Sequence, residues 1–320
     1  MDTKLIVSAS PHLRSDESTQ DLMANVIVAL TPCVVASAII FGLRALLVVA
    51  VSVIACVAFE WLYCKLLKKQ SPIGDLSAVV TGIILALNVP VNMPLGELVI
   101  GALVSIIIVK QLFGGIGMNF ANPALVGRIV LFISFATEMN AWVYPDAAVD
   151  QLSKATPLQV ANPGKLNLLD LFMGIHGGVL GETCALAIVL GFVYLVVTKT
   201  ISAAIPVAYV GSMFVFYMIA TGSVHESLAA VLSGGLLFGA VFMATDYVTS
   251  PFTLKGKLIY GLALGAVTFA IRYWGSYTEG VSFALLFMNL WVPFINDATR
   301  QTPYGYVKPA KKAGKEGASK

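Results

Sequence analysis

The sequence predicts an all-α integral membrane protein with about ten transmembrane helices. Of its 320 residues, 58% are hydrophobic and only 12% are charged, whereas soluble domains are roughly 25% charged. The mean hydropathy is +0.86, and the apolar residues form long blocks approaching the ~20 residues that cross a bilayer as a helix. Too little polar surface remains to cover a water-soluble globule. Disordered, collagen-like, coiled-coil and small disulfide-stabilised chains are excluded as well.

Ten apolar blocks are the expected spans. They cover residues 22–41, 45–66, 76–90, 97–113, 123–137, 183–198, 203–221, 228–245, 258–274 and 281–296. Turn residues and charges separate the blocks, as at Lys68–Pro72, Val89–Pro94 and Ser250–Pro251. The first 20 residues contain acidic residues and no apolar stretch of signal-peptide length, so we expect the first block to be an uncleaved span.

The lysines and arginines indicate the orientation in the membrane. With ten spans and a cytoplasmic N-terminus, all but four of the 20 basic residues fall on the cytoplasmic side; the exceptions are Arg44, Lys154, Lys165 and Arg272. Both termini are then cytoplasmic, because a miscounted span would invert everything downstream. The predicted parts are a cytoplasmic N-terminus (1–21), a first half of five spans (22–137), an extracytoplasmic loop (138–182), a second half of five spans (183–296) and a cytoplasmic basic tail (297–320).

Two short echoes suggest an internal repeat. Residues 113–118 (FGGIGM) match residues 238–243 (FGAVFM) at three of six positions, and residues 78–82 (AVVTG) are similar to residues 230–234 (AVLSG). The two echoes imply different alignments, so they cannot both reflect one repeat. The second suits a five-plus-five inverted repeat, since an odd number of helices inverts the second copy. Small residues shared at helix contacts explain the echoes equally well.

The cysteines and histidines do not indicate a metal cofactor. Cys33, Cys56, Cys64 and Cys184 lie in or beside apolar blocks and form no C-x-x-C motif, so we interpret them as small packed hydrophobes. An iron–sulfur cluster held by this chain alone would need grouped thiolates, and haem would need imidazoles inside the spans. The net charge of +3 is spread over loops and the tail and does not indicate nucleic-acid binding.

Two acidic residues in the first half interrupt the lipid-like pattern. Asp75 begins a short, Gly/Pro-interrupted span, which is typical of a half-helix beside an ion or substrate site. The alternative is a helix start whose charge lies near the N-terminal dipole. Glu60 lies well inside a span, and we interpret it as reaching toward the cytoplasmic face beside Lys65.

A glycine-rich segment between two spans, Lys110–Arg128, is a candidate binding site. Its glycines allow close approach of the backbone to a ligand. The side-chain amides of Asn119 and Asn122 can pair with the donor and acceptor edge of a planar heterocycle. The alternative is a Gly-rich turn with an asparagine helix cap.

Two further acidic residues follow apolar spans directly. Asp246 lies in Met243–Pro251 and Asp297 follows Asn296 at the end of the last span. Each could neutralise a cation in transit or simply end a helix in water.

The outer loop carries the motif that identifies a family resemblance. Asp150–Leu158 reads DQLSKATPL and is similar to the flavinylation motif D-x-x-S-G-A-T-x-L, in which Thr carries FMN through a phosphoester bond. With the three internal segments in the same order, residues 20–300 resemble the D subunit of Rnf ion-translocating oxidoreductase complexes. The homologous B subunit of the sodium-translocating NADH:quinone reductase has a longer N-terminal region. Lys154 stands where the family commonly has glycine.

The resemblance implies two flavins on opposite sides of the membrane. FMN would be attached to Thr156, next to Ser153 and Ala155, by a flavin transferase. Riboflavin would bind without a covalent bond beside Asn119 and Asn122, near the cytoplasmic side.

The resemblance also implies an ion pathway and partner subunits. The acidic positions tied to cation passage map onto Asp246 and Asp297, to which we add Asp75. The complex would lie in the cytoplasmic membrane of a prokaryote and couple electron transfer between ferredoxin and NAD to transport of Na⁺ or H⁺. Iron–sulfur and flavin partner subunits would hold the substrate sites, since this chain has no dinucleotide-binding motif. The alternatives are a B-type quinone-reductase subunit and a redox-inactive, ion-coupled secondary transporter.

Overall fold

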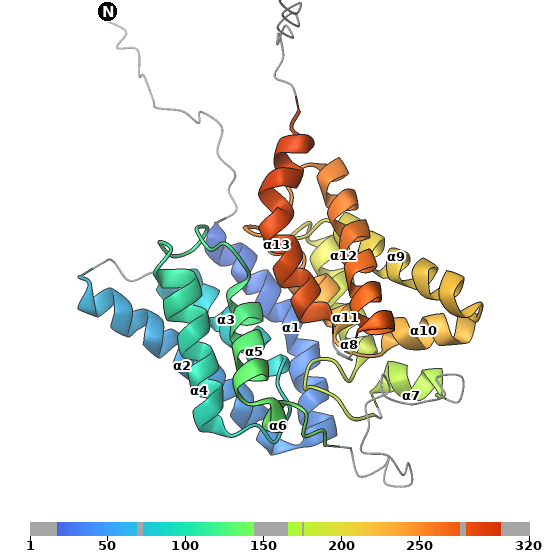
Figure 1. Cartoon of the computed structure of the whole chain (residues 1–320). Helices are drawn as coiled ribbons and strands as arrows, with labels where there is room; N and C mark the ends of the chain where they lie inside the picture. Colours follow the sequence, from blue (N-terminus) through green and yellow to red (C-terminus); the bar gives the residue numbers. More distant parts are fainter. Residues whose placement is uncertain (1–17, 69–72, 144–165, 175, 276–279, 302–320) are drawn as a thin grey trace, which may run out of the picture.

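The computed structural model describes residues 18–68, 73–143, 166–174, 176–275 and 280–301, and none of these residues forms a strand (Figure 1). The first half contains α1 (Thr19–Phe41), α2 (Leu43–Leu66), η1 (Ile73–Asp75), α3 (Ser77–Leu87), α4 (Leu95–Leu103), the π-helix η2 (Val104–Gln111), α5 (Pro123–Ser134) and α6 (Ala136–Met139). After α7 (Leu168–Met173), the second half contains α8 (Ala185–Val197), α9 (Ala204–Thr221), α10 (Val224–Leu232), α11 (Leu236–Phe238), the π-helix η6 (Gly239–Met243), α12 (Leu254–Trp274) and α13 (Val281–Ala298).

The predicted membrane class is confirmed. Helices α1, α2, α9, α12 and α13 are long and apolar enough to cross a membrane, and α10 with α11–η6 forms a sixth such unit bent by 65°. The remaining predicted blocks coincide with α3, α5, α8 and the continuous segment α4–η2. Each of the ten blocks is therefore helical over most of its length. That the four shorter segments also cross the bilayer remains a prediction.

Large apolar side chains cover the outside of the bundle. Leu43 is 85% exposed, Ile39 79% and Ile219 76%. Exposed large apolar side chains are expected on helices that face lipid, and their number agrees with the predicted membrane class.

The two halves pack in corresponding ways. Helix α2 packs against α3 and α4 in the first half, and α9 packs against α10 and α12 in the second half. Likewise, α4 packs against α5, and α12 packs against α13. Between the halves α1 packs against α8, and the Tyr194 hydroxyl donates to Asn25 Oδ1 at 3.2 Å. A Cβ on Gly191 would lie 2.4 Å from the Ala29 carbonyl oxygen, so glycine is needed for this close approach. These pairings support the five-plus-five repeat.

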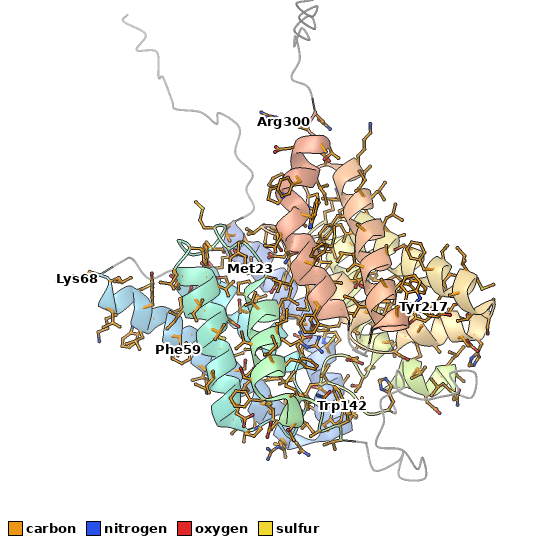
Figure 2. All side chains as sticks on the ribbon, in the orientation of Figure 1. Met23, Phe59, Lys68, Trp142, Tyr217 and Arg300 are labelled. Carbon is orange, nitrogen blue, oxygen red and sulfur yellow. The ribbon has the colours of Figure 1, made fainter. Side chains whose placement is uncertain are left out.

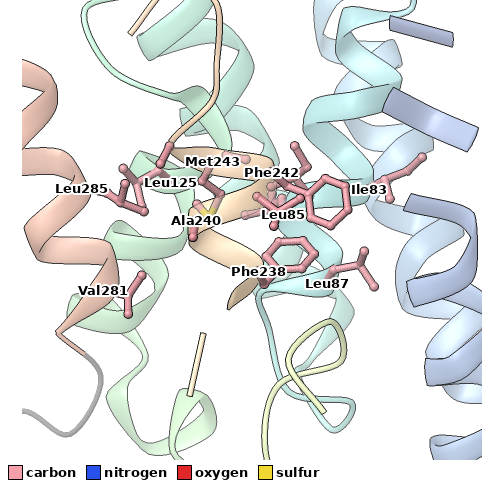
Figure 3. Close-up of a cluster of buried hydrophobic side chains, with 14 of the residues drawn as sticks. Ile83, Leu85, Leu87, Leu125, Phe238, Ala240, Phe242, Met243, Val281 and Leu285 are labelled. Carbon is pink, nitrogen blue, oxygen red and sulfur yellow. The ribbon is translucent and has the colours of Figure 1, made fainter. Parts of the chain in front are cut away.

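The core joins the short helices of both halves. Figure 3 shows side chains of α3 and α5 meeting those of α11, η6 and α13. The contributors are Ile83, Leu85, Leu87, Leu125, Phe238, Ala240, Phe242, Met243, Val281 and Leu285. Ten of the eleven residues of α3 are buried. A helix that is apolar on all sides is expected in the centre of a bundle.

Arginine side chains pair with backbone carbonyl groups in both halves. The Arg44 Nε donates to the Val91 carbonyl at 2.9 Å, in the connection between α3 and α4. Arg272 Nη1 donates to the Ala230 carbonyl at 2.9 Å, near the end of α10. Irregular backbone is tolerated at membrane depth only where protein groups or a water-filled cavity satisfy it. Each arginine therefore satisfies a carbonyl group where regular helix ends.

Candidate functional site

Three segments singled out from the sequence border one cavity of about 430 Å³. They are the short span that begins at Asp75, Lys110–Arg128 and Met243–Pro251. The cavity's polar side chains are Thr19 of α1, Ser77 and Thr81 of α3, Lys110 of η2, Asn119 and Asn122 before α5, and Thr245, Asp246 and Tyr247 after η6. The starts of α1, α3 and α5 meet the ends of η2, α8 and η6 here. From the distribution of basic residues, this end of the bundle is the one predicted to face the cytoplasm.

The rest of the cavity wall is apolar. Much of it comes from α1, α3 and η6, and it includes Met23, Val80, Ile84, Val241 and Phe242. Met23 is labelled in Figure 2, where Trp142 lies toward the opposite end of the bundle. A mainly apolar pocket of ~300–1,000 Å³ with a few polar groups is typical of cofactor sites.

Asn122 caps α5 with its side-chain oxygen, and its amide NH₂ is not used in the cap. Its Oδ1 accepts hydrogen bonds from the backbone N–H groups of Ala124 at 3.1 Å and Leu125 at 3.3 Å. Pro123 occupies the first helical position, where its missing N–H is harmless. The cap interpretation is therefore confirmed. Because the oxygen is occupied, only the amide NH₂ of Asn122 remains for a ligand in the cavity.

Asn119 connects the glycine-rich turn to Asp246. Its Nδ2 donates to the Ala121 carbonyl at 2.9 Å, and its side chain also hydrogen-bonds to the Asp246 carboxylate. Thr249 Oγ1 donates to Asp246 Oδ2 at 3.0 Å. Desolvation raises the pKa of the Asp246 carboxyl, and these hydrogen bonds oppose that shift. Asn119 therefore lies in the cavity wall and also links the two predicted segments.

A buried charge network adjoins the cavity. Lys110 Nζ lies 2.6 Å from Glu60 Oε1 and donates to Ser77 Oγ at 2.6 Å. Gln111 Nε2 donates to the same Glu60 oxygen at 2.6 Å. Asp75 Oδ1 accepts from the Ser77 backbone N–H at 2.9 Å, so it holds the start of α3 as its sequence position suggested.

The interpretation of Glu60 as reaching the cytoplasmic surface is wrong. Its side chain is 0% exposed and pairs with Lys110. The neighbouring Lys65 instead lies over the Trp61 ring, 4.5 Å from its centroid. Glu60 turns inward because a cation on another helix compensates its charge there, which a residue-by-residue reading cannot detect.

Asp297 lies apart from the other predicted site residues. It is exposed in the last turn of α13 and does not line the cavity. The flavinylation motif, with Ser153, Ala155 and Thr156, lies outside the described residues, so the FMN site stays a prediction. In the part of the chain that is described, the four cysteines are free and no group of three His, Cys, Asp or Glu could hold a metal ion.

Sequence reasoning missed a second cavity beside the first. It has a volume of about 390 Å³ and shares Ile201, Thr245 and Tyr247 with the first cavity. The Tyr247 hydroxyl donates to the Thr200 carbonyl between them. Only the position of Tyr247 next to Asp246 could have drawn attention to it.

Comparison with known proteins assigns the family. The model of the NQR2, RnfD, RnfE family matches residues 6–305. The chain belongs to this family. The resemblance seen in the sequence motifs is therefore confirmed over almost the whole chain.

Three relatives within this family align over nearly their full length. The chain is 42% identical to the D subunit of the Na(+)-translocating ferredoxin:NAD(+) oxidoreductase complex of Acetobacterium woodii, over 97% of this chain and 98% of that protein. It is 37% identical to the D subunit of the proton-translocating ferredoxin:NAD(+) oxidoreductase complex of Clostridium ljungdahlii, over 93% and 96%. It is 33% identical to the D subunit of the ion-translocating oxidoreductase complex of Vibrio cholerae, over 94% and 99%.

Proposed function

We propose that this chain is the flavin-carrying D subunit of an Rnf-type complex. Such a complex couples electron transfer between ferredoxin and NAD to translocation of Na⁺ or H⁺. The near full-length similarity to the D subunits of two ferredoxin:NAD(+) oxidoreductase complexes and of one ion-translocating oxidoreductase complex supports this role. One relative is named for sodium and another for protons, so the proposal covers either ion. Iron–sulfur and flavin partner subunits supply the ferredoxin and NAD sites.

The observation that carries the proposal is the convergence of Lys110, Asn122 and Asp246 on one mainly apolar cavity. A flavin ring needs flat apolar walls and hydrogen-bond donors for its carbonyl oxygens. Phe242 and Ile84 supply walls, and the Asn122 amide NH₂ supplies a donor. The side chains present therefore fit riboflavin, which when bound supplies one- and two-electron redox chemistry.

The protein's own groups bind and orient this cofactor. The Asn122 amide donates to the ring, while its oxygen fixes the start of α5. Asn119 holds the turn against Asp246. The apolar wall from α1, α3 and η6 limits access of water to the ring.

The second flavin and the orientation complete the proposal. FMN is attached to Thr156 by a flavin transferase, in a loop on the extracytoplasmic side that also contains Ser153 and Ala155. Both termini are cytoplasmic, and the complex lies in the inner membrane of a prokaryote. The charge distribution of the loops and tail supports this orientation.

Acidic groups at the cytoplasmic end belong to the ion pathway in this proposal. Asp246 lines the cavity, and Asp75 hydrogen-bonds to Ser77 in its wall. Asp297 is exposed at the end of α13, so it would meet ions only at the cytoplasmic surface.

Intact mass and acid extraction of the purified protein test the proposal. We expect a mass raised by one covalently attached FMN, and riboflavin in the acid extract. An unmodified mass together with a flavin-free extract would leave the rival function, a redox-inactive transporter, which is colourless.

A further inference from the structure

Lys110 is the cation in the wall of the large cavity. It lies near the end of the π-helix η2 and is 3% exposed. π-Helical turns are rare and occur frequently at functional sites. Here the turn brings two consecutive side chains, Lys110 and Gln111, to the same oxygen of Glu60.

The Lys110–Glu60 pair is oriented with its positively charged member toward the cavity. Lys110 and its second partner, Ser77, line the cavity, whereas Glu60 and Gln111 do not. Glu60 Oε2 has no hydrogen-bond partner among the described residues. The pair is neutral in sum, but its positive end lies against the cavity and its negative end lies behind it.

This direction matters for a redox cofactor. A flavin that takes up electrons without an equal number of protons becomes more negative. In a poorly solvated site a nearby cation stabilises that negative charge much more than it would in water. Charged protein groups beside a flavin ring are a means of tuning its electronic properties.

We propose that Lys110 sets the reduction potential of the riboflavin in this cavity, and that Glu60 fixes the ammonium and moderates its effect. This inference rests on the proposed function. The electrons come from the reduced donor in the complex and leave to its acceptor. No bond of Lys110 is made or broken, so Lys110 is a positioning and tuning residue.

Replacing the two charges separately gives the test, because their effects differ in sign. The measurement is a spectroelectrochemical titration of riboflavin in the purified full-length chain. A Thr156→Ala background removes the overlapping signal of covalent FMN. Lys110→Met should make the equilibrium constant for reduction about tenfold smaller, which lowers the potential by about 30 mV for a two-electron couple. Glu60→Gln should raise the potential.

Two further variants keep the test decisive. Lys110→Arg retains the charge and should leave the potential close to that of the Thr156→Ala background. The double variant Glu60→Gln with Lys110→Met removes both charges of the pair and should return the potential toward the background value, even if Lys110→Met alone does not fold. A pair with only a structural role would shift the potential in the same direction in both single variants, or in neither, and either result overturns the inference.

The riboflavin content of each preparation separates this inference from the proposed function. A wild-type extract without riboflavin overturns the proposed function and this inference with it. Riboflavin at the normal ratio with an unchanged potential in Lys110→Met and Glu60→Gln overturns only the inference about Lys110.

Discussion

Glu60 and Lys110 lie 50 residues apart in the sequence and join α2 to η2 through a contact of 2.6 Å between buried charged groups. Neither charge has access to bulk water, because the side chains are 0% and 3% exposed. Each charge is therefore tolerated only while the other is present. This interdependence makes the pair a requirement of the bundle around the cavity.

Removing one member of this pair should destabilise the protein strongly. Lys110→Met leaves Glu60 as an uncompensated buried charge, which costs about 3–5 kcal/mol. The double variant Glu60→Gln with Lys110→Met should regain most of this loss, since neutral side chains need no counter-charge. Thermal unfolding in detergent measures both. Equal unfolding midpoints for the single and double variants would show that the charges are not coupled.

Asn122 allows its two roles to be separated. Asn122→Asp keeps the oxygen that caps α5 and removes the amide NH₂, so riboflavin binding should weaken by about 0.5–1.5 kcal/mol while unfolding is unchanged. Asn122→Ala also loses the cap, which costs about 1 kcal/mol of stability. Chromatography of acid extracts counts riboflavin per chain. If Asn122→Asp retains full riboflavin content and affinity, the residue is only a helix cap.

Thr156 is expected to be the attachment point of FMN. Thr156→Ala should abolish covalent flavin but leave the protein in the membrane, because the predicted loop lies outside the bilayer. In-gel fluorescence under ultraviolet light detects only attached flavin. Lys154→Gly restores the glycine common in the family and should keep or strengthen the fluorescent band. An unchanged band in Thr156→Ala would place the attachment elsewhere.

The orientation can be checked by cysteine labelling from outside the cell. The four native cysteines are free, three of them are buried and the fourth is partly buried, so their background labelling should be low. A cysteine introduced near Lys154 should react with an impermeant thiol reagent, and one near Lys312 should not. The reverse pattern would place the FMN loop on the cytoplasmic side.

Hydropathy was sufficient to locate the helices because lipid leaves few alternatives to a helical span. All ten predicted blocks coincide with helical segments, including the short α3 and α5. The turn chemistry before α5 was also readable, since Asn122-Pro123 is a local signal for a helix start. A helix start of this kind is determined by residues adjacent in the chain, so it can be predicted from the sequence.

The arrangement of the site depended on contacts between distant segments. Asn119 and Asp246 were each singled out, but nothing in their positions revealed that they hydrogen-bond to one another. Glu60 was misread because its partner lies on another helix. Asp297 shares with Asp246 a place at the end of a span, yet it ends on the exposed surface. These outcomes depend on which helices pack together. Local patterns in a single sequence do not reveal that packing.

The most direct test of the proposed function is a cryo-EM density map of the purified complex at the cavity between α3, η2 and η6. We expect a flat, three-ringed density beside Phe242, within hydrogen-bond distance of the Asn122 amide and near Lys110. A cavity filled only by a lipid chain or by water would contradict the central claim that this chain holds riboflavin at the cytoplasmic end of its bundle.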